Sequence, residues 1–170
     1  MNEIFTRRSI RTFQNRPVEK TKIDRLLRAA MQAPSALSQQ AWEFIVVEDK
    51  DALSKLSSAT IGSKSVAGSA VTIVLLANKN RLKAESVWKN DMGAAAQNIL
   101  LEAVHLGLGA VWQGVGREES AQLIQALFDY PDYIMPFALI SIGYPDGAKN
   151  EFIDRYDAQK VHHEKWEESK

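Results

Sequence analysis

The stretch from Asp91 to Gly116, DMGAAAQNILLEAVHLGLGAVWQGVG, constrains the fold most, because it is the longest segment with almost no charge. Apolar residues recur at three- and four-residue spacing in its first half, which predicts a helix over Met92–Leu106. Further apolar groups on the other sides predict that this helix is buried nearly all round. Gly107 fits the left-handed position that ends a helix.

The second half of this stretch predicts a short buried strand that runs into a glycine-rich turn. Ala110–Trp112 is the expected strand, and Gln113–Gly116 follows it directly. Glycines at a strand end let a ligand approach bare backbone N–H groups. The alternative, on this stretch alone, is a core helix, strand and turn with no ligand, since glycines commonly mark the ends of helices and strands.

Composition limits the class of protein. A chain of 170 residues favours one domain over 1–170. Lys plus Arg equals Asp plus Glu at 21 each, so bulk charge favours neither a nucleic-acid partner nor a membrane surface. There are no cysteines, which excludes disulfide scaffolds and thiolate chemistry. No apolar signal segment opens the chain, and no apolar run approaches the roughly 20 residues of a membrane span. These features predict a cytoplasmic globular protein.

Helical and strand patterns alternate along the rest of the chain, without repeats or a linker. Helices are expected over Glu19–Ala33, Lys50–Ala59 and Glu118–Phe128, and a loop over Ile61–Ser69. Strands are expected over Trp42–Val47, Val71–Ala77 and Pro136–Tyr144, and the second of them is expected to be fully buried. Asn78–Asn90 is polar and hard to assign, with a broken helix containing Trp88 as one interpretation. The alternation predicts an α/β or α+β fold with a sheet between helices.

The N-terminal segment Phe5–Arg16 is rich in arginine, whose forked guanidinium matches phosphate oxygens. If the segment is helical, three arginines share one face because they are three and four residues apart; they are Arg7, Arg8 and Arg11. The alternative is a solvated basic N-terminus. Ile10 and Phe13, set between the arginines, favour a segment that is packed down.

Two further segments are unusual for their position. Pro34–Trp42 is a polar loop with Ser35, Ser38 and two glutamines, whose amides suit the edge of a heterocycle. The alternative is an ordinary loop capped by its serines. The tail Phe152–Lys170 is highly charged but keeps aromatic and branched side chains, which predicts an arm that packs on another surface, such as a second subunit.

Metal and nucleophile chemistry find little support. None of the three histidines forms a His-x-x-x-His or His-Glu-x-x-His pattern, and His105 is expected to be a core histidine within the central helix. A Gly-x-Ser-x-Gly elbow is absent. What remains is a set of arginines, serines, glutamines and glycine backbone. Such a set can bind a phosphorylated heterocycle and leave the reaction to the cofactor.

Taken in order, four motifs resemble the nitroreductase family of FMN-dependent oxidoreductases. They are RRSIRTF at Arg7–Phe13; APSALSQQAWEF at Ala33–Phe44; Asp91–Leu101 followed by Leu106–Gly109; and Gly143–Pro145 with Arg155 and Val161–His162. The match spans nearly the whole chain, and the order of the motifs makes it more specific than any one of them.

This resemblance implies an α+β fold with a central, mostly antiparallel sheet flanked by helices. It further implies an intertwined homodimer with two FMN molecules at the subunit interface, in which residues 152–170 embrace the partner. In family terms Arg7, Ser9 and Arg155 would grip the FMN phosphate, with Arg8 beside them. Arg11 would lie near the pyrimidine edge of the flavin, where a cation stabilises the reduced anionic ring.

Two more groups of residues are implied at the flavin ring. The partner subunit's loop would line the ring through Pro34, Ser35, Ala36, Ser38 and Gln40. The strand end would present backbone N–H groups to flavin N5 through Trp112, Gln113 and Gly114. The implied activity is ping-pong hydride transfer from NADH or NADPH, through N5, to a nitroaromatic, quinone or similar small acceptor. No side chain is expected to act as an acid or base.

The chain departs from the family at two loop positions. Ser38 stands where the family usually has Asn, and Ala41 where it usually has Pro. Because serine is shorter, we expect one hydrogen bond to the flavin ring to be lost or to be relayed by a water molecule. These departures keep open a flavin-binding or sensing protein without reductase turnover. A nucleotide- or RNA-binding domain is the other alternative, opposed by the zero net charge and the lack of an aromatic stacking platform.

Overall fold

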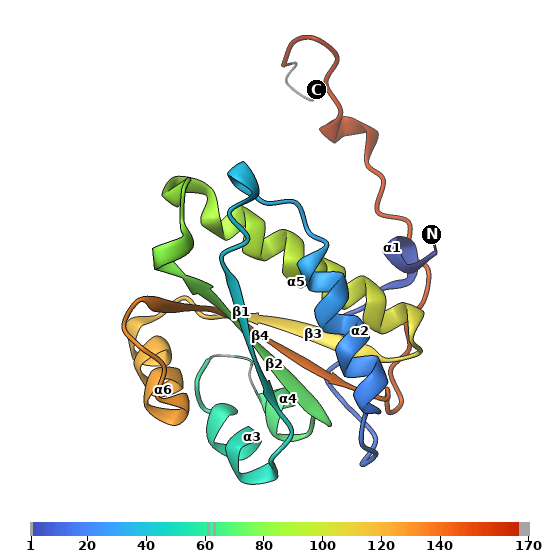
Figure 1. The fold of residues 1–170 in the computed structure, drawn as a ribbon. Helices are drawn as coiled ribbons and strands as arrows, with labels where there is room; N and C mark the ends of the chain where they lie inside the picture. Colours follow the sequence, from blue (N-terminus) through green and yellow to red (C-terminus); the bar gives the residue numbers. More distant parts are fainter. Residues whose placement is uncertain (1, 61, 63, 167–170) are drawn as a thin grey trace.

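The computed structural model describes residues 2–60, 62 and 64–166. At its centre is a four-stranded antiparallel sheet with strand order β1-β2-β4-β3. The strands are β1 (Trp42–Val47), β2 (Val71–Asn78), β3 (Gly109–Gly114) and β4 (Ile134–Gly143). The expected α+β fold is confirmed, with helices on both faces of the sheet (Figure 1).

The two faces of the sheet carry separate hydrophobic cores, because successive strand residues point to opposite sides. Val71, Ile73 and Leu75 of β2 pack with helices α2 (Lys20–Met31) and α5 (Trp88–His105). Val74 and Leu76 pack instead with α3 (Lys50–Leu56), α4 (Lys64–Ala67) and α6 (Glu118–Phe128). Burial on both faces explains why β2 is apolar without a break from Ile73 to Ala77.

The central helix α5 begins four residues before the expected Met92, at Trp88. Short 3-10 turns, η2 (Lys79–Arg81) and η3 (Glu85–Val87), precede it and account for the polar stretch that gave no clear element. Gly107 ends the helix region with φ +73°, as expected. Burial all round is wrong for the single chain, since the Gln97 side chain of α5 is exposed.

The N-terminal arginine segment is extended, so the conditional helix is wrong. Helix α1 (Glu3–Thr6) stops before Arg7. Ser9 forms a parallel bridge with Ala110 of β3, and the Ile10 N–H donates to the Ala110 carbonyl at 3.1 Å. Pairing to the open edge of β3 satisfies the backbone that a helix would otherwise satisfy. Arg7, Arg8 and Arg11 therefore do not share a helical face.

Glycines in the sheet make room for this segment. A Cβ at Gly109 would lie 2.7 Å from Ile10 Cβ, and one at Gly143 would lie 3.0 Å from Phe13 Cβ. Ile10 is buried, whereas its neighbours Ser9 and Arg11 are exposed. The period-two alternation thus turns the apolar side chains onto the sheet and the polar ones outward.

The expected loop over Ile61–Ser69 is in part a helix. Residues 61 and 63 lie outside the described residues, but α4 spans Lys64–Ala67. Val66 is fully buried in the core beneath α3 and α6. Tertiary burial of one side chain here overrides a sequence whose small and polar residues favour a loop.

A polar cluster ties α2 to the end of β4. The Tyr144 hydroxyl lies 2.7 and 2.9 Å from the two Glu19 carboxylate oxygens and accepts a hydrogen bond from Lys22 Nζ at 2.8 Å. The Arg16 guanidinium stacks 3.8 Å from the Tyr144 ring centroid. Hydrogen bonding by Tyr144, above all, lowers the pKa of Glu19 to about 2.

We expect Tyr144→Phe to lower the free energy of unfolding at neutral pH and to lose that effect in acid. Because the folded-state pKa of Glu19 is depressed from 4.5 to about 2, its contribution is present above pH 4.5 and disappears as pH falls towards 2. Urea unfolding of the parent and of Tyr144→Phe at several pH values measures how the difference in their unfolding free energies shrinks as the pH falls. Tyr133→Phe, at an exposed tyrosine, is the control; a difference that stays constant down to pH 2 would contradict the assignment.

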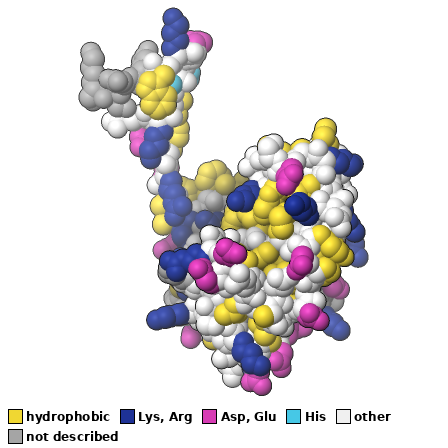
Figure 2. Space-filling view, turned by 90° about the vertical axis from the view of Figure 1, so that its left-hand side faces the viewer, with side chains coloured by type: hydrophobic (Ala, Val, Ile, Leu, Met, Phe, Trp, Pro, Cys, Tyr) yellow, Lys and Arg dark blue, Asp and Glu magenta, His cyan; other side chains and the backbone are white. Residues whose placement is uncertain are grey.

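The C-terminal segment leaves the body of the molecule (Figure 1), and the view in Figure 2 shows it standing clear. It contains one 3-10 turn, η4 (Ala158–Lys160). Several of its apolar side chains are more than two-fifths exposed: Phe152, Ile153, Tyr156, Val161 and Trp166. An arm with such side chains has the apolar surface to pack on another molecule, as the sequence predicts.

Candidate functional site

Three segments that are distant in the sequence meet at one cavity of about 390 Å³. Its lining combines the extended N-terminal segment, the exposed side of α5 and the end of β3: Arg7, Ser9, Gln97, Leu100, Trp112 and Gly114. The volume is within the range of small-molecule sites. Four of these residues are predicted site residues; Gln97 and Leu100 were not predicted to belong to the site.

Strand alternation decides which residues of β3 face the cavity. Trp112 and Gly114 point to the α5 side, where Trp112 Cη2 lies 3.6 Å from a Cβ built on Gly93. The side chain of Gln113 points to the other face and is buried, with the Ser65 and Ser141 hydroxyls 2.7 and 3.1 Å from its amide. Only the backbone of Gln113 is therefore available to a ligand in this cavity.

The cavity has a cluster of positive charge at one end. Burial, followed by the charges of Arg155 and Arg8, lowers the pKa of Arg7. Among the described residues, none of these three arginines has a carboxylate within ion-pair distance. Three guanidinium groups held close without an acidic partner favour an anion as the ligand.

Arg8 and Asn150 fix the geometry beside this cluster. The Arg8 backbone N–H donates to Asn150 Oδ1 at 3.0 Å, and Asn150 Nδ2 donates to the Leu108 carbonyl at 3.0 Å. The Arg8 guanidinium donates to the carbonyls of Arg7 and Phe5. Its Nε is buried without a partner among the described residues. Asn150 was not predicted as a site residue, because a single asparagine in a polar turn carries no sequence signal.

Arg11 is exposed and lies next to Ser9. Its Nη1 donates to the Ser9 carbonyl at 3.1 Å, so it lies on the same segment as the cavity residues without lining the cavity. A guanidinium in this place is free to reach the far edge of a ligand bound beside Ser9.

The loop Pro34–Gln40 is held in a strained conformation against the first turn of α5. Leu37, Ser38 and Gln40 have φ between 44° and 50°, which non-glycine residues rarely adopt. The loop includes the 3-10 turn η1 (Ala36–Ser38), and the Gln40 N–H donates to Ser35 Oγ at 3.2 Å. Strained backbone of this kind gathers at ligand sites and persists only where surrounding contacts hold it.

Asp91 and Gln39 supply these holding contacts. Asp91 is 8% exposed and accepts hydrogen bonds from the Ala36 N–H at 3.1 Å and from Gln39 Nε2. Gln39 Oε1 in turn accepts from the Lys83 and Ala84 N–H groups at 2.9 and 3.0 Å. The sequence suggested only ligand recognition for the Gln39 amide. The contacts instead give it a structural role, which depends on two segments more than 40 residues away.

We expect Asp91→Ala to destabilise the protein by about 2–3 kcal/mol, because the Ala36 N–H and the Gln39 amide lose their acceptor in a buried place. Proteolysis should become faster at Pro34–Gln40 in particular. Chemical denaturation and limited proteolysis measure the two effects. Asp24→Ala, at an exposed aspartate of α2, is the matched control; equal behaviour of the two variants would contradict the role of Asp91.

A neighbouring cavity of about 370 Å³ shares Trp112 and Gly114 with the first. Its wall is aromatic: the Trp88 and Phe137 rings are 5.9 Å apart, and the Trp112 and Phe137 rings are 5.6 Å apart. Lys89 also lines it, with Nζ 5.7 Å from the Trp88 ring. The end of β3 therefore lies between a polar, cationic cavity and an aromatic one.

His105 is not a core histidine. Its side chain is 55% exposed, and its Nδ1 lies 3.1 Å from Glu3 Oε1 of α1. The last turn of α5 reaches the edge of the fold, where α1 covers it only partly. Among the described residues no group of three His, Asp or Glu side chains could hold a metal ion. Within the same part of the chain, no helix has the length and apolar character needed to cross a membrane.

The protein is a small α+β protein with α5 on one face of an antiparallel sheet. A cationic cavity lies between that helix, β3 and the N-terminal segment. The sequence matches the Nitroreductase family over residues 4–68 and 57–144. The chain belongs to this family, and the expected relationship is confirmed.

Three proteins are similar to this one over almost its full length. A proposed NADH dehydrogenase/NAD(P)H nitroreductase from Archaeoglobus fulgidus is 40% identical over 167 residues, 96% of each chain. The structure of a proposed NADH oxidase from Clostridium acetobutylicum has a TM-score of 0.94 and 49% identity, covering 96% of this chain and 99% of that one. A proposed nitroreductase from Desulfovibrio desulfuricans in complex with FMN has a TM-score of 0.85 and 32% identity, covering 98% and 96%.

Proposed function

We propose that this protein works as a cytoplasmic homodimer that transfers hydride from NADH or NADPH, by a ping-pong sequence, to a nitroaromatic, quinone or similar small acceptor. Its class is that of an FMN-dependent NAD(P)H oxidoreductase, as its family and its named relatives show. FMN supplies the hydride exchange when bound. The acceptor, the ping-pong order, the dimer and the cytoplasmic location are the parts that we propose.

The observation that carries the proposal is the unpaired cationic end of the Arg7 cavity. A flavin phosphate supplies the charge that Arg7, Arg8 and Arg155 lack, and the buried Arg8 Nε is a donor without a partner among the described residues. Ser9, which lines the same cavity, adds a hydroxyl. These residues fit a phosphate, and we assign the phosphate grip to them.

The far end of the same cavity suits the flavin ring. Gly114 is exposed and lines the cavity, so its backbone is open to a ring atom. Arg11, next to Ser9, is placed to face the pyrimidine edge. Of the loop residues Pro34, Ser35, Ala36, Ser38 and Gln40, Ala36 contacts α5 through its hydrogen bond to Asp91, whereas the cavity meets α5 at Gln97 and Leu100. We therefore assign these loop residues to the flavin of the partner subunit.

A dimer also accounts for the exposed apolar side chains. Ile4 and Phe5 of α1 are 51% and 55% exposed, and the arm carries further apolar side chains. Monomers rarely expose such surface. Sedimentation equilibrium of the full chain and of a chain lacking residues 152–170 tests the dimer. A full chain that sediments as a monomer while retaining FMN would refute it.

The activity is tested by the visible spectrum of the purified protein, followed by NADH or NADPH without oxygen. Flavin bands that bleach establish the cofactor and its reduction together. Steady-state rates are then measured while the nucleotide and an acceptor, menadione or a nitrobenzoate, are both varied. Parallel double-reciprocal lines are expected if the reaction is ping-pong. Bands that persist with both nucleotides would favour a flavin-binding protein without turnover.

A further inference from the structure

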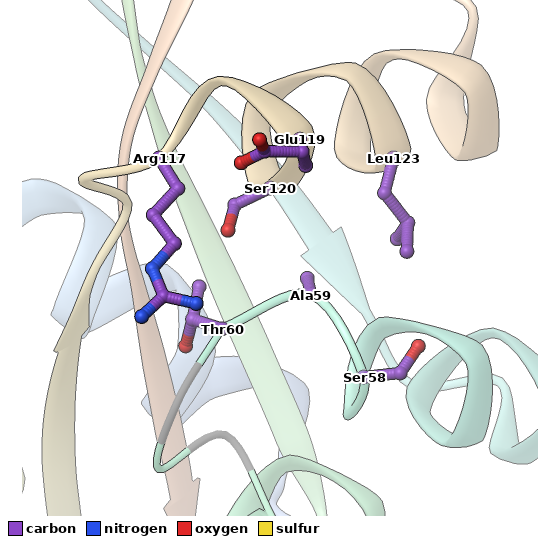
Figure 3. Close-up of a pocket in the computed structure, with 7 residues that line it drawn as sticks. All are labelled: Ser58, Ala59, Thr60, Arg117, Glu119, Ser120 and Leu123. Atoms are coloured by element: carbon purple, nitrogen blue, oxygen red, sulfur yellow. The ribbon is translucent and has the colours of Figure 1, made fainter.

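A further cavity, of about 660 Å³, lies on the other face of the sheet from α5. It opens between the start of α6 and the residues that follow α3 (Figure 3). Its lining is Ser58, Ala59, Thr60, Arg117, Glu119, Ser120 and Leu123. None of these residues belongs to the flavin site.

The start of α6 leaves hydrogen-bond donors open at this cavity. Its N-cap residue is Arg117, whose side chain makes no capping hydrogen bond. Arginine has no acceptor atom and cannot do what Ser, Thr, Asp or Asn does at this position. Within the described chain, the N–H groups of Glu118, Glu119 and Ser120 have no acceptor. Unpaired first-turn N–H groups and the helix dipole attract an anion.

Ser120 is the second, independent feature. Its residue is 6% exposed, and among the described residues its hydroxyl makes no hydrogen bond. Figure 3 shows this hydroxyl pointing into the cavity, towards the Ala59–Thr60 segment. Ser120 Oγ keeps access to the cavity, unlike the fully buried Arg8 Nε, so a ligand in the cavity can reach this hydroxyl. The other serine, Ser58, already donates to the Lys55 carbonyl at 2.8 Å.

The charges at the cavity are mixed. Arg117 reaches into it beside Thr60, and within the described residues it has no carboxylate at ion-pair distance. The Glu119 side chain lies on the same face of α6 above Ser120, and Ala59 and Leu123 add apolar surface. A bare anion gains from Arg117 but meets Glu119. An anion carried on a hydroxyl-bearing body can also donate hydrogen bonds to that carboxylate.

We propose that this cavity binds a phosphomonoester of a sugar or polyol. The phosphate lies at the start of α6, where the open N–H groups, the Ser120 hydroxyl and the Arg117 guanidinium donate to its oxygens. The hydroxyl-bearing body extends along Glu119 and over Leu123. The site is separate from the flavin cavity, so it is independent of the function proposed above.

The test is an amide-resolved NMR titration of the FMN-loaded protein with ribose 5-phosphate, because bound FMN fills the Arg7 site. We expect saturable shifts at the Glu118, Glu119 and Ser120 amides, with weaker binding of inorganic phosphate and no binding of ribose. Equal shifts with ribose, or no saturable shift at these amides, would overturn the site. Inorganic phosphate binding as tightly as ribose 5-phosphate would overturn the assignment of a hydroxyl-bearing body.

Variants at the two key residues separate binding from folding. Arg117→Asp removes the cation and supplies an N-cap, so we expect loss of ribose 5-phosphate binding with a Tm no lower than that of the parent. Ser120→Ala should weaken binding about threefold to tenfold, since one hydrogen bond is lost. Arg28→Asp makes the same charge change at an exposed position of α2 and should bind normally. Unchanged affinity in Arg117→Asp would refute the proposal.

Discussion

Gly109→Ala should destabilise the protein by about 1–3 kcal/mol and lower its FMN content, because the added methyl group has no space. Its Cβ would lie 2.7 Å from both Cβ and Cγ2 of Ile10. The Ile10 Cβ is fixed to a backbone that pairs with β3, so rotation of the side chain cannot relieve the contact. The segment that carries Arg7 and Ser9 must shift instead.

Chemical denaturation and the ratio of flavin to protein absorbance measure these two effects. Gly68→Ala is the matched control, since a Cβ there meets nothing within 4 Å and the backbone needs no positive φ. A Gly109→Ala protein as stable as Gly68→Ala, with full FMN content, would show that the N-terminal segment is not held in the way described.

Arg7→Ala should weaken FMN binding about tenfold to hundredfold while leaving riboflavin binding nearly unchanged. A charge-assisted hydrogen bond to phosphate contributes about 1.5–3 kcal/mol, and riboflavin has no phosphate to lose. The protein without flavin should not become less stable, because burial, and then the charges of Arg155 and Arg8, lower the pKa of Arg7 and so oppose its charge. Removal of the arginine relieves that repulsion.

Fluorescence quenching during flavin titration measures the affinities for FMN and for riboflavin, and thermal unfolding measures the stability of the flavin-free protein. Arg28→Ala removes the same charge at an exposed site on α2, so it should match the parent in both affinities and in stability. Equal losses of FMN and riboflavin affinity in Arg7→Ala would place this residue at the ring or in the fold, and not at the phosphate.

The regular elements could be predicted where pattern and burial agree. Strand β1 and helix α6 begin and end at the expected residues, because their ends carry clear changes in composition. Helix α4 was missed because one buried valine stabilises it. The stretch with Trp88 was hard to assign, and its interpretation as a broken helix agrees with the short turns that lead into α5 at Trp88. A helix start without a capping side chain carries little sequence signal.

Some residues of the candidate site could be predicted from motifs, whereas others could not, because their roles depend on distant partners. Arg7, Ser9, Trp112 and Gly114 were named from motifs, and they do line one cavity. Asn150 and the structural role of Asp91 were not foreseen, because their importance rests on partners far away in the chain. The assignment of each residue to a part of FMN stays a prediction.

The sequence alone determined the family, the two-sided burial of β2 and the glycine that ends the α5 region, because periodicity, motif order and positive φ are local properties. Only the tertiary structure decided that the N-terminal arginines lie on an extended segment. The sequence of the N-terminal segment alone cannot show that Ile10 and Phe13 fit against Gly109 and Gly143. Nor can it show that β3 has a free edge with which this segment pairs. The cavity is built from these long-range contacts, and local sequence does not encode them separately.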